Sequence, residues 1–172
     1  SGWTAEPAGP DRPAPPSVLT VEPPVEIGVI SDTHGRLRAE ALLALAGCDV
    51  IFHAGDVCGP LILPQLAELA PCHAVAGNCD DDASLPTARC EVVAGLRVLL
   101  HHGHLPLDER SYRPDIVITG HTHVPRVERD GAVLRVNPGS AGPRRFNLPV
   151  TVARIAVRAG VPEARLIALD VP

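Results

Sequence analysis

The chain contains no lysine and no methionine, and aromatic residues make up only 2% of its 172 residues. All fifteen basic residues are therefore arginines, dispersed along the chain, and the net charge is −5. A long nucleic acid needs a basic stripe to neutralise its phosphates, so this composition argues against one as the main partner. Scarce aromatics also argue against a nuclease that stacks bases. The core must be built from aliphatic side chains.

Paired cysteines and long apolar runs are absent as well. The five cysteines are an odd number without C-x-x-C spacing, which predicts reduced thiols rather than disulfides or a cysteine-based zinc site. No apolar run approaches the ~18–20 residues of a membrane span. The N-terminus lacks the basic-then-apolar pattern of a signal peptide. These features predict a cytoplasmic protein that does not insert into membranes.

Residues 1–24 differ in composition from the rest of the chain, because they contain seven prolines. Proline removes backbone donors and fixes φ, so we expect a disordered tail here, although a proline-rich ligand for another protein is an alternative. Residues 25–172 are expected to form one domain.

The first half of that domain alternates strands with helices. Apolar runs predict strands at 26–30, 49–53 and 72–76, and helical periodicity predicts helices at 36–46 and 61–70. Strands that alternate with helices favour a parallel sheet with right-handed crossovers.

The second half consists mainly of predicted strands, with a loop or at most a short helix at 104–114. Short turns between apolar runs are typical of hairpins. Two sheets packed face to face and flanked by helices would hold all of these elements. The predicted strands are 89–93, 97–101, 115–119, 126–129, 132–136, 149–158 and 163–170.

Five short polar turns each follow a predicted strand. In open α/β sheets ligands bind beyond the carboxyl ends of the strands, so we expect these turns to meet at one site. They supply Asp, Asn and His donors without a thiolate, a set that suits Mn²⁺, Fe or Zn²⁺. The pattern predicts a two-metal hydrolytic centre acting on phosphate esters. The turns are Ser31–Gly35, Ala54–Asp56, Gly77–Asp80, His101–His104 and Gly120–His123.

Simpler interpretations remain for single residues in these turns. Asp56 could only cap the following helix, and Asn78 could be an ordinary turn residue. His53 and His101 lie within or at the end of strands, where a structural role is expected. His73 is expected to have no special role. Of the two histidines that flank Gly103, at most one is expected to bind metal.

Taken in order, the D-x-H, G-D, G-N, H-G-H and G-H-T-H motifs resemble those of the calcineurin-like metallophosphoesterase superfamily. The greatest resemblance is to its small prokaryotic phosphodiesterases, which share their fold with the 29-type vacuolar sorting subunit of retromer. The resemblance covers residues 26–170. It implies an α/β fold, a four-layer α/β/β/α sandwich of two mixed sheets flanked by helices, with a dinuclear metal site.

Residue by residue, the resemblance also implies roles at the site. The first metal would be held by Asp32, His34 and His123, and the second by Asn78, His102 and His121, with Asp56 bridging both. Two divalent ions are implied, with Mn²⁺ expected and Fe, Zn²⁺ or Ni²⁺ as alternatives. Such a pair of ions can share a hydroxide that attacks phosphorus.

Two later segments and one departure complete the resemblance. Asn137–Ser140 and Pro143-Arg144 resemble a segment at the mouth of the site, so Asn137 and Arg144, with Asn78, are expected to contact substrate; a plain turn is the alternative. Much of the superfamily has Gly-Asn-His-Glu where this chain has Gly77-Asn78-Cys79-Asp80. Since the histidine there is assigned as the general acid, His104 or Asp80 would have to replace it.

The sequence thus predicts a divalent-metal-dependent phosphodiesterase or phosphatase that acts on a small soluble phosphate ester. Catalytic roles are expected for Asp56, Asn78 and His104. Because general acid help is worth ~10²–10⁴-fold, the departure at Cys79 predicts a preference for good leaving groups. The alternative is a non-catalytic metal-binding scaffold of the same fold that binds protein partners. Edge strands could also pair two copies of the chain into a homo-oligomer.

Overall fold

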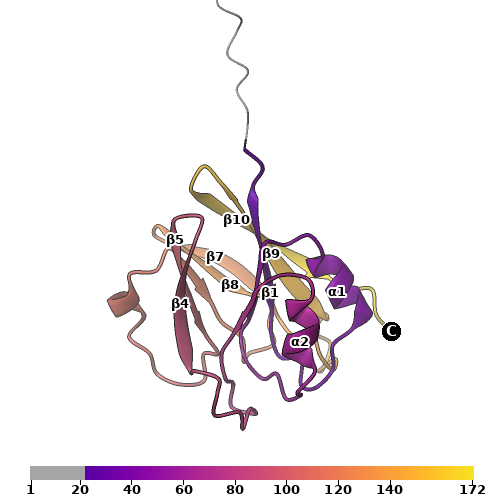
Figure 1. Ribbon diagram of the computed structural model, residues 1–172. Helices are drawn as coiled ribbons and strands as arrows, with labels where there is room; N and C mark the ends of the chain where they lie inside the picture. The colour runs from indigo at the N-terminus through magenta and orange to yellow at the C-terminus, as the bar shows by residue number, and fades with distance from the viewer. Residues whose placement is uncertain (1–21) are drawn as a thin grey trace, which may run out of the picture.

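A computed structural model describes residues 22–172. The predicted proline-rich tail lies outside the described residues, apart from residues 22–24, which precede the first strand without regular structure. The described part forms two five-stranded sheets that face each other (Figure 1). This arrangement confirms the α/β sandwich of two mixed sheets.

The first sheet has the strand order β10-β9-β1-β2-β3. Strands β1 (Val25–Ile30), β2 (Val50–His53) and β3 (Cys72–Ala74) are parallel, as the alternation of strands and helices predicts. The C-terminal hairpin of β9 (Thr151–Arg158) and β10 (Val161–Ala168) joins this sheet, because β9 pairs antiparallel with β1.

The second sheet has the order β4-β5-β6-β8-β7. Its centre is parallel, with β6 (Ile116–Ile118) between β5 (Leu96–His101) and β8 (Val133–Asn137). The edges are antiparallel: β4 (Ala88–Val93) pairs with β5, and β7 (Arg126–Asp130) with β8. Both sheets are therefore mixed.

Two short helices, α1 (Ala39–Leu45) and α2 (Ile62–Ala67), cover the outer face of the first sheet. Their buried faces join Ile30 and Ile51 in one apolar cluster. Both helices are shorter than predicted. Helix α1 starts late because the N–H groups of His34 and Gly35 donate to carbonyls of the turn after β2, at 2.9 and 2.8 Å, instead of starting a helix.

The outer layer on the second sheet is the single 3-10 turn η1 (Glu109–Tyr112), within the segment predicted as a loop with at most a short helix. It is tied to the sheet through Glu109, which bonds to His101 at 2.9 Å and to Arg135 at 2.6 Å. Within residues 22–172 no helix is long and apolar enough to cross a membrane.

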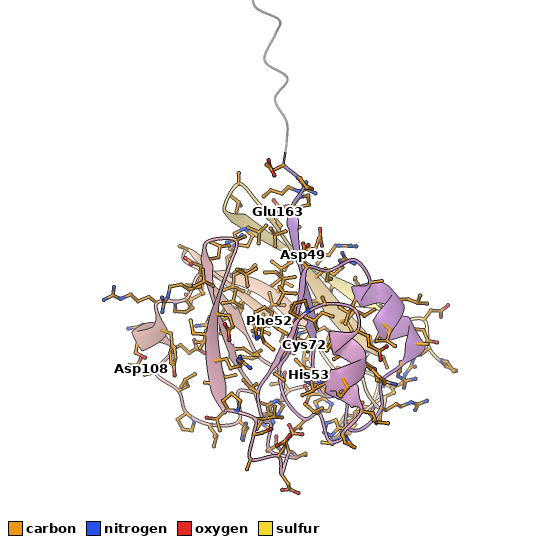
Figure 2. All side chains as sticks on the ribbon, viewed as in Figure 1. Asp49, Phe52, His53, Cys72, Asp108 and Glu163 are labelled. Carbon is orange, nitrogen blue, oxygen red and sulfur yellow. The ribbon has the colours of Figure 1, made fainter. Side chains whose placement is uncertain are left out.

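An aliphatic core lies between the sheets, with Phe52 as its fully buried aromatic residue. Because side chains alternate along a strand, Ile27 and Val29 of β1 face Val98 and Leu100 of β5 across this layer. Asp49 and His53 lie at opposite ends of β2 (Figure 2), and the carboxyl ends of the parallel strands all point toward the His53 end. This packed core fixes the two sheets so that their polar turns meet.

Candidate metal centre

The five polar turns meet at the carboxyl ends of the strands, as predicted. Neighbouring turns are joined by backbone hydrogen bonds: the N–H of Asp32 donates to Gly55 O at 3.0 Å, and the N–H of Gly120 donates to His102 O at 3.1 Å. The first bond joins the turns after β1 and β2, and the second joins the turns after β5 and β6. The N–H of His121 donates to Asp32 Oδ2 at 3.1 Å, so a third bond joins the turns of one sheet to those of the other.

One group of donors consists of Asp32, His34 and His123. Asp32 Oδ1 lies 3.1 Å from His123 Nε2, and the two imidazole Nε2 atoms are 3.4 Å apart. His34 Nε2 also lies 3.8 Å from Asp32 Oδ1. Metal–nitrogen and metal–oxygen bonds are about 2.0–2.2 Å long, so donors at this spacing can bind a single ion.

A second group consists of Asn78, His102 and His121. Asn78 Oδ1 lies 3.1 Å from both His102 Nε2 and His121 Nδ1. Asp56 lies between the two groups, because its Oδ2 is 3.4 Å from His102 Nε2 and 3.5 Å from His34 Nε2. All seven side chains assigned to metal binding by the resemblance therefore converge on one cluster.

The hydrogen bonds around the cluster orient its donors. Asp32 Oδ2 accepts from Ser31 Oγ at 2.6 Å, whereas Oδ1 is buried, accepts no hydrogen bond and faces the cluster. Asp56 Oδ1 accepts from the N–H of Cys79 at 2.8 Å, which leaves Oδ2 for the cluster. A buried carboxylate oxygen with no partner is costly unless a cation completes it, so these residues fit divalent metal.

Backbone conformation at the cluster is unusual. Five of the donor residues have a positive φ, namely Asp32, His34, Asp56, His121 and His123, with angles from 45° to 68°. Residues other than glycine rarely adopt this region, and such strain concentrates at functional sites. The strained turns direct side chains from successive strands inward. The sequence did not predict these positive φ angles, because Asp and His adopt negative φ in most positions.

Electrostatics at the cluster favour the forms that bind metal. Burial raises the pKa of Asp56, but the Cys79 N–H and the neighbouring imidazoles of His102 and His34 outweigh it, so the pKa lies below its usual value. Burial lowers the pKa of His123 more than the charge of Asp32 raises it. The carboxylate is thus ionised and the imidazole neutral, the states required of ligands.

The remaining histidines near the strand ends are held by bonds to protein groups, as expected. His53 is fully buried: its Nδ1 accepts from the N–H of Gly55 at 3.2 Å, and its Nε2 donates to Thr33 Oγ1 at 2.9 Å. Burial lowers its pKa to about 4. His101 bonds to Glu109, and His73 packs against Phe52 with ring centroids 5.4 Å apart.

The candidate general acids differ in how they are bound. Asp80 accepts from the N–H groups of Val57, Cys58 and Gly77 at 3.2, 2.8 and 2.8 Å, so its carboxylate joins the turn after β2 to the turn after β3. His104 lies next to the second donor group, with its ring centroid 5.2 Å from that of His102. Its Nδ1 is buried without a partner. Of the two candidate acids, His104 is therefore the one whose side chain is not occupied by hydrogen bonds to the protein backbone.

Two thiols lie beside the cluster: that of Cys79, which the sequence marked as a departure from the family's motif, and that of Cys58, which sequence reasoning overlooked. The Cys79 thiol lies within 4.8 Å of donor atoms of His34 and Asp56. Cys58 Sγ is 3.8 Å from His34 Nδ1 and 3.5 Å from Cys79 O. The only signal for Cys58 was its position two residues after the Ala54–Asp56 turn.

The two later residues expected to contact substrate are bonded within the protein. Asn137 donates to Gly120 O at 2.9 Å and to Thr122 Oγ1 at 3.1 Å, and its Oδ1 accepts from the N–H of Gly139. Arg144 donates to Val171 O at 3.0 Å. Burial raises the pKa of Cys79 and lowers that of His123, and the positive charge of the adjacent Arg145 opposes the first shift and adds to the second. Substrate contacts by Asn137 and Arg144 remain predictions.

Several known proteins resemble this chain in sequence and in structure. A probable metallophosphoesterase of Methanothermobacter thermautotrophicus is 37% identical over 164 residues, covering 81% of this chain and 95% of that protein. Phosphodiesterase YfcE of Escherichia coli K12 is 31% identical over 139 residues, 64% of this chain and 76% of that protein. The solved structure of Vacuolar Protein Sorting 29 from Cryptosporidium parvum has a TM-score of 0.69 at 20% identity, covering 85% of this chain and 98% of that one.

Residues 25–160 match the family described as the calcineurin-like phosphoesterase superfamily domain. The match includes all five turns and all seven donor side chains of the cluster. The chain therefore belongs to the calcineurin-like phosphoesterase superfamily.

Proposed function

We propose that the protein is a divalent-metal-dependent phosphoesterase that hydrolyses small phosphate esters with a dinuclear centre. The observation that carries this proposal is the position of Asp56 Oδ2, 3.4 Å from His102 of one donor group and 3.5 Å from His34 of the other. A carboxylate that is shared between two donor groups suits a pair of ions. The name of the E. coli relative supports a phosphodiester as substrate.

In this proposal the seven donors hold two divalent ions, for which the mixture of oxygen and nitrogen atoms suits Mn²⁺ and also Fe, Zn²⁺ or Ni²⁺. When bound, such ions make water nucleophilic near neutral pH and neutralise the phosphoryl oxygens. The protein's contribution is to orient each donor. His102 and Asp56 are fixed by Ala54 O and by the N–H of Cys79.

We assign His104 as the general acid that protonates the leaving oxygen. It lies beside the second donor group, with its ring centroid 5.2 Å from that of His102 and 6.1 Å from that of His121. If His104 donates the proton, His104→Gln should slow hydrolysis of alkyl esters by about 10²–10⁴-fold more than that of p-nitrophenyl esters. Equal slowing of both ester types would remove His104 from this role.

Wild-type rates that do not depend on the leaving group would contradict the expected preference for good leaving groups.

The proposed substrate is small and the proposed compartment is the cytoplasm. The net charge of −5 and the dispersed arginines support a small ester rather than a long nucleic acid or a membrane surface. All five cysteines are free, which supports a reducing environment.

The test is hydrolysis of bis(p-nitrophenyl) phosphate and p-nitrophenyl phosphate with Mn²⁺ added after removal of metal. We expect metal-dependent turnover that falls by at least about 100-fold in Asp56→Asn, since even residues that only support ligands are worth 10–100-fold. Asp49→Asn is a matched control, because Asp49 lies at the opposite end of β2 (Figure 2). Turnover that is the same with and without Mn²⁺, and the same in wild type and Asp56→Asn, would refute the proposal.

The second candidate is a metal-binding scaffold for protein partners. The fold likeness to Vacuolar Protein Sorting 29 and the cysteine at the usual acid position favour it. No metal-dependent turnover on any ester, together with intact metal binding, would support the scaffold over the enzyme.

A further inference from the structure

A cavity of about 570 Å³ lies beside the metal centre, between the start of α2 and the loop that follows β3. Its lining comes from three consecutive stretches of chain: the turn after β2, the first turn of α2, and residues 79–85. The five donor residues in the turns after β1, β5 and β6 do not contribute to it. The cavity is therefore a neighbour of the donor cluster and not part of it.

Two residues connect the cavity with the cluster. Cys79 lines the cavity, while its N–H donates to Asp56 Oδ1 at 2.8 Å and its thiol lies within 4.8 Å of donor atoms of His34 and Asp56. Cys58 also lines it, with Sγ 3.8 Å from His34 Nδ1. A phosphoryl group held at the donors would have one of its ester substituents within a few atoms of the cavity.

The lining combines an apolar floor with an acidic rim. Val57 is buried and Leu63 and Leu85 are partly buried, and all three belong to the apolar cluster beneath α1 and α2. Asp81 and Asp82 stand on the rim and are exposed. None of the residues that line the cavity is basic.

The three carboxylates that line the cavity are not equivalent. Asp80 is held by three backbone N–H groups that join the turns. Asp82 accepts from the N–H and the hydroxyl of Ser84 at 2.9 and 2.6 Å, and these bonds lower its pKa. Asp81 and Asp82 thus present negative charge at the cavity, where an anionic group would be repelled and a cationic one attracted.

We propose that this cavity receives the leaving group of a phosphodiester substrate. It selects an alcohol with an apolar carbon skeleton and a positive charge over an alcohol with a negative charge. This inference rests on the proposed function. In the reaction, the oxygen of water bonds to phosphorus and the bond from phosphorus to the ester oxygen breaks. The alcohol departs with a proton that ultimately comes from the water, and a phosphomonoester remains. The apolar floor contacts the carbon skeleton of the alcohol, and the rim faces its charge.

The kinetic test uses three methyl aryl phosphates whose phenols carry a para trimethylammoniomethyl, neopentyl or sulfonatomethyl group. Each kcat/KM with Mn²⁺ is divided by the uncatalysed rate, so that intrinsic reactivity cancels. We expect the ratio of cationic to anionic ester to fall at least about fivefold in the double variant Asp81→Asn/Asp82→Asn. Asp108→Asn, an exposed aspartate next to η1 and away from the strand ends (Figure 2), should keep the wild-type ratio.

A second measurement needs neither metal nor turnover. Cys58 and Cys79 line the cavity, so their reaction rates with a cationic and an anionic methanethiosulfonate report its charge directly. Peptide mapping by mass spectrometry separates them from Cys90, which lies on β4. The ratio of the rate with the cationic reagent to the rate with the anionic reagent should be at least about fivefold higher at Cys58 and Cys79 than at Cys90. In the double variant this difference between the cysteines should disappear.

The outcomes separate the two proposals. If all three esters are hydrolysed and the double variant does not change the ratio of cationic to anionic ester, the leaving-group assignment is overturned, whereas the proposed phosphoesterase function stands. Equal labelling of Cys58 and Cys79 by both reagents would overturn it as well. Absence of metal-dependent hydrolysis with every ester would overturn the proposed function, and the leaving-group assignment with it. Urea unfolding of each variant establishes that the comparison is between folded proteins.

Discussion

The imidazole of His102 donates from Nδ1 to the carbonyl oxygen of Ala54 at 2.6 Å. A carbonyl can only accept, so Nδ1 carries the proton and the lone pair is on Nε2. That atom lies 3.1 Å from Asn78 Oδ1 and 3.4 Å from Asp56 Oδ2. A backbone group of one turn thus fixes the tautomer of a histidine 48 residues away, a support that metal-binding histidines usually have.

This orientation makes His102 a strong test of the second donor group. We expect His102→Ala to lower the Mn²⁺ content of metal-loaded, dialysed protein from two ions per chain toward one, as measured by elemental analysis. His73→Ala is the control, because His73 packs against Phe52 and lies outside the cluster. Two ions retained in His102→Ala would contradict the assignment of this residue.

The glycine before Asn78 is required for a close approach of two turns. A Cβ at Gly77 would overlap the carboxylate of Asp56, so Gly77→Ala must displace that side chain. We expect the Mn²⁺ affinity, measured by calorimetric titration, to fall by more than about tenfold, in line with the loss of a ligand's support.

Gly95 offers a matched control for this substitution. It has a φ of +79° and nothing within 4 Å of an added Cβ, so Gly95→Ala adds only the backbone cost of about 1 kcal/mol. It should lower the free energy of unfolding without changing the metal affinity. The prediction for Gly77 fails if both variants bind Mn²⁺ as the wild type does.

Asn137 holds the Gly120–His123 turn in place from β8. Asn137→Ala would leave the buried N–H of Gly139 and the carbonyl of Gly120 without their side-chain partner, at a cost of about 3 kcal/mol in unfolding free energy. Urea denaturation measures this cost. The exposed Asn147→Ala should change it by less than about 0.5 kcal/mol. Equal stability of the two variants would show that Asn137 does not support the turn.

His53 should make stability depend on pH. Its pKa is about 4 in the folded protein and near 6.5 when unfolded, so the unfolded state binds more protons between these values. The contribution of the neutral imidazole is fully present above pH 6.5 and is lost as the pH falls toward 4. We expect the difference in unfolding free energy between wild type and His53→Gln to shrink by about 3 kcal/mol over this range.

Urea unfolding at several pH values measures that difference. Comparing the two proteins at each pH removes the contribution of other acidic groups, which both share. Parallel curves for wild type and variant would mean that His53 is protonated equally in the folded and unfolded states.

Much of the fold and of the site was accessible from the sequence. The alternation of strands and helices up to residue 76 and the hairpins after residue 88 are encoded in local periodicity, and both were found. The five turns were recognisable because Gly, Asp, Asn and His follow each apolar run within a few residues. Each of these signals depends only on neighbours along the chain.

Other features depended on contacts between distant residues. Sequence alone did not give the pairing of β9 with β1 or the late start of α1, which follows from bonds of His34 and Gly35 to the turn after β2. The sequence also did not predict the hydrogen bonds to Asp80 or the cavity lined by residues 79–85.

The sequence by itself determined which donors the protein carries and where along the chain they lie. Only the tertiary structure decided how they are used: which Asp56 oxygen faces the cluster, which nitrogen of His102 is free, and that Asp32 Oδ1 accepts no hydrogen bond. The physical reason is that a side chain's identity is local, whereas its orientation and protonation are set by hydrogen bonds and burial. Those depend on residues 23 to 108 positions away, which only the folding of the chain brings together.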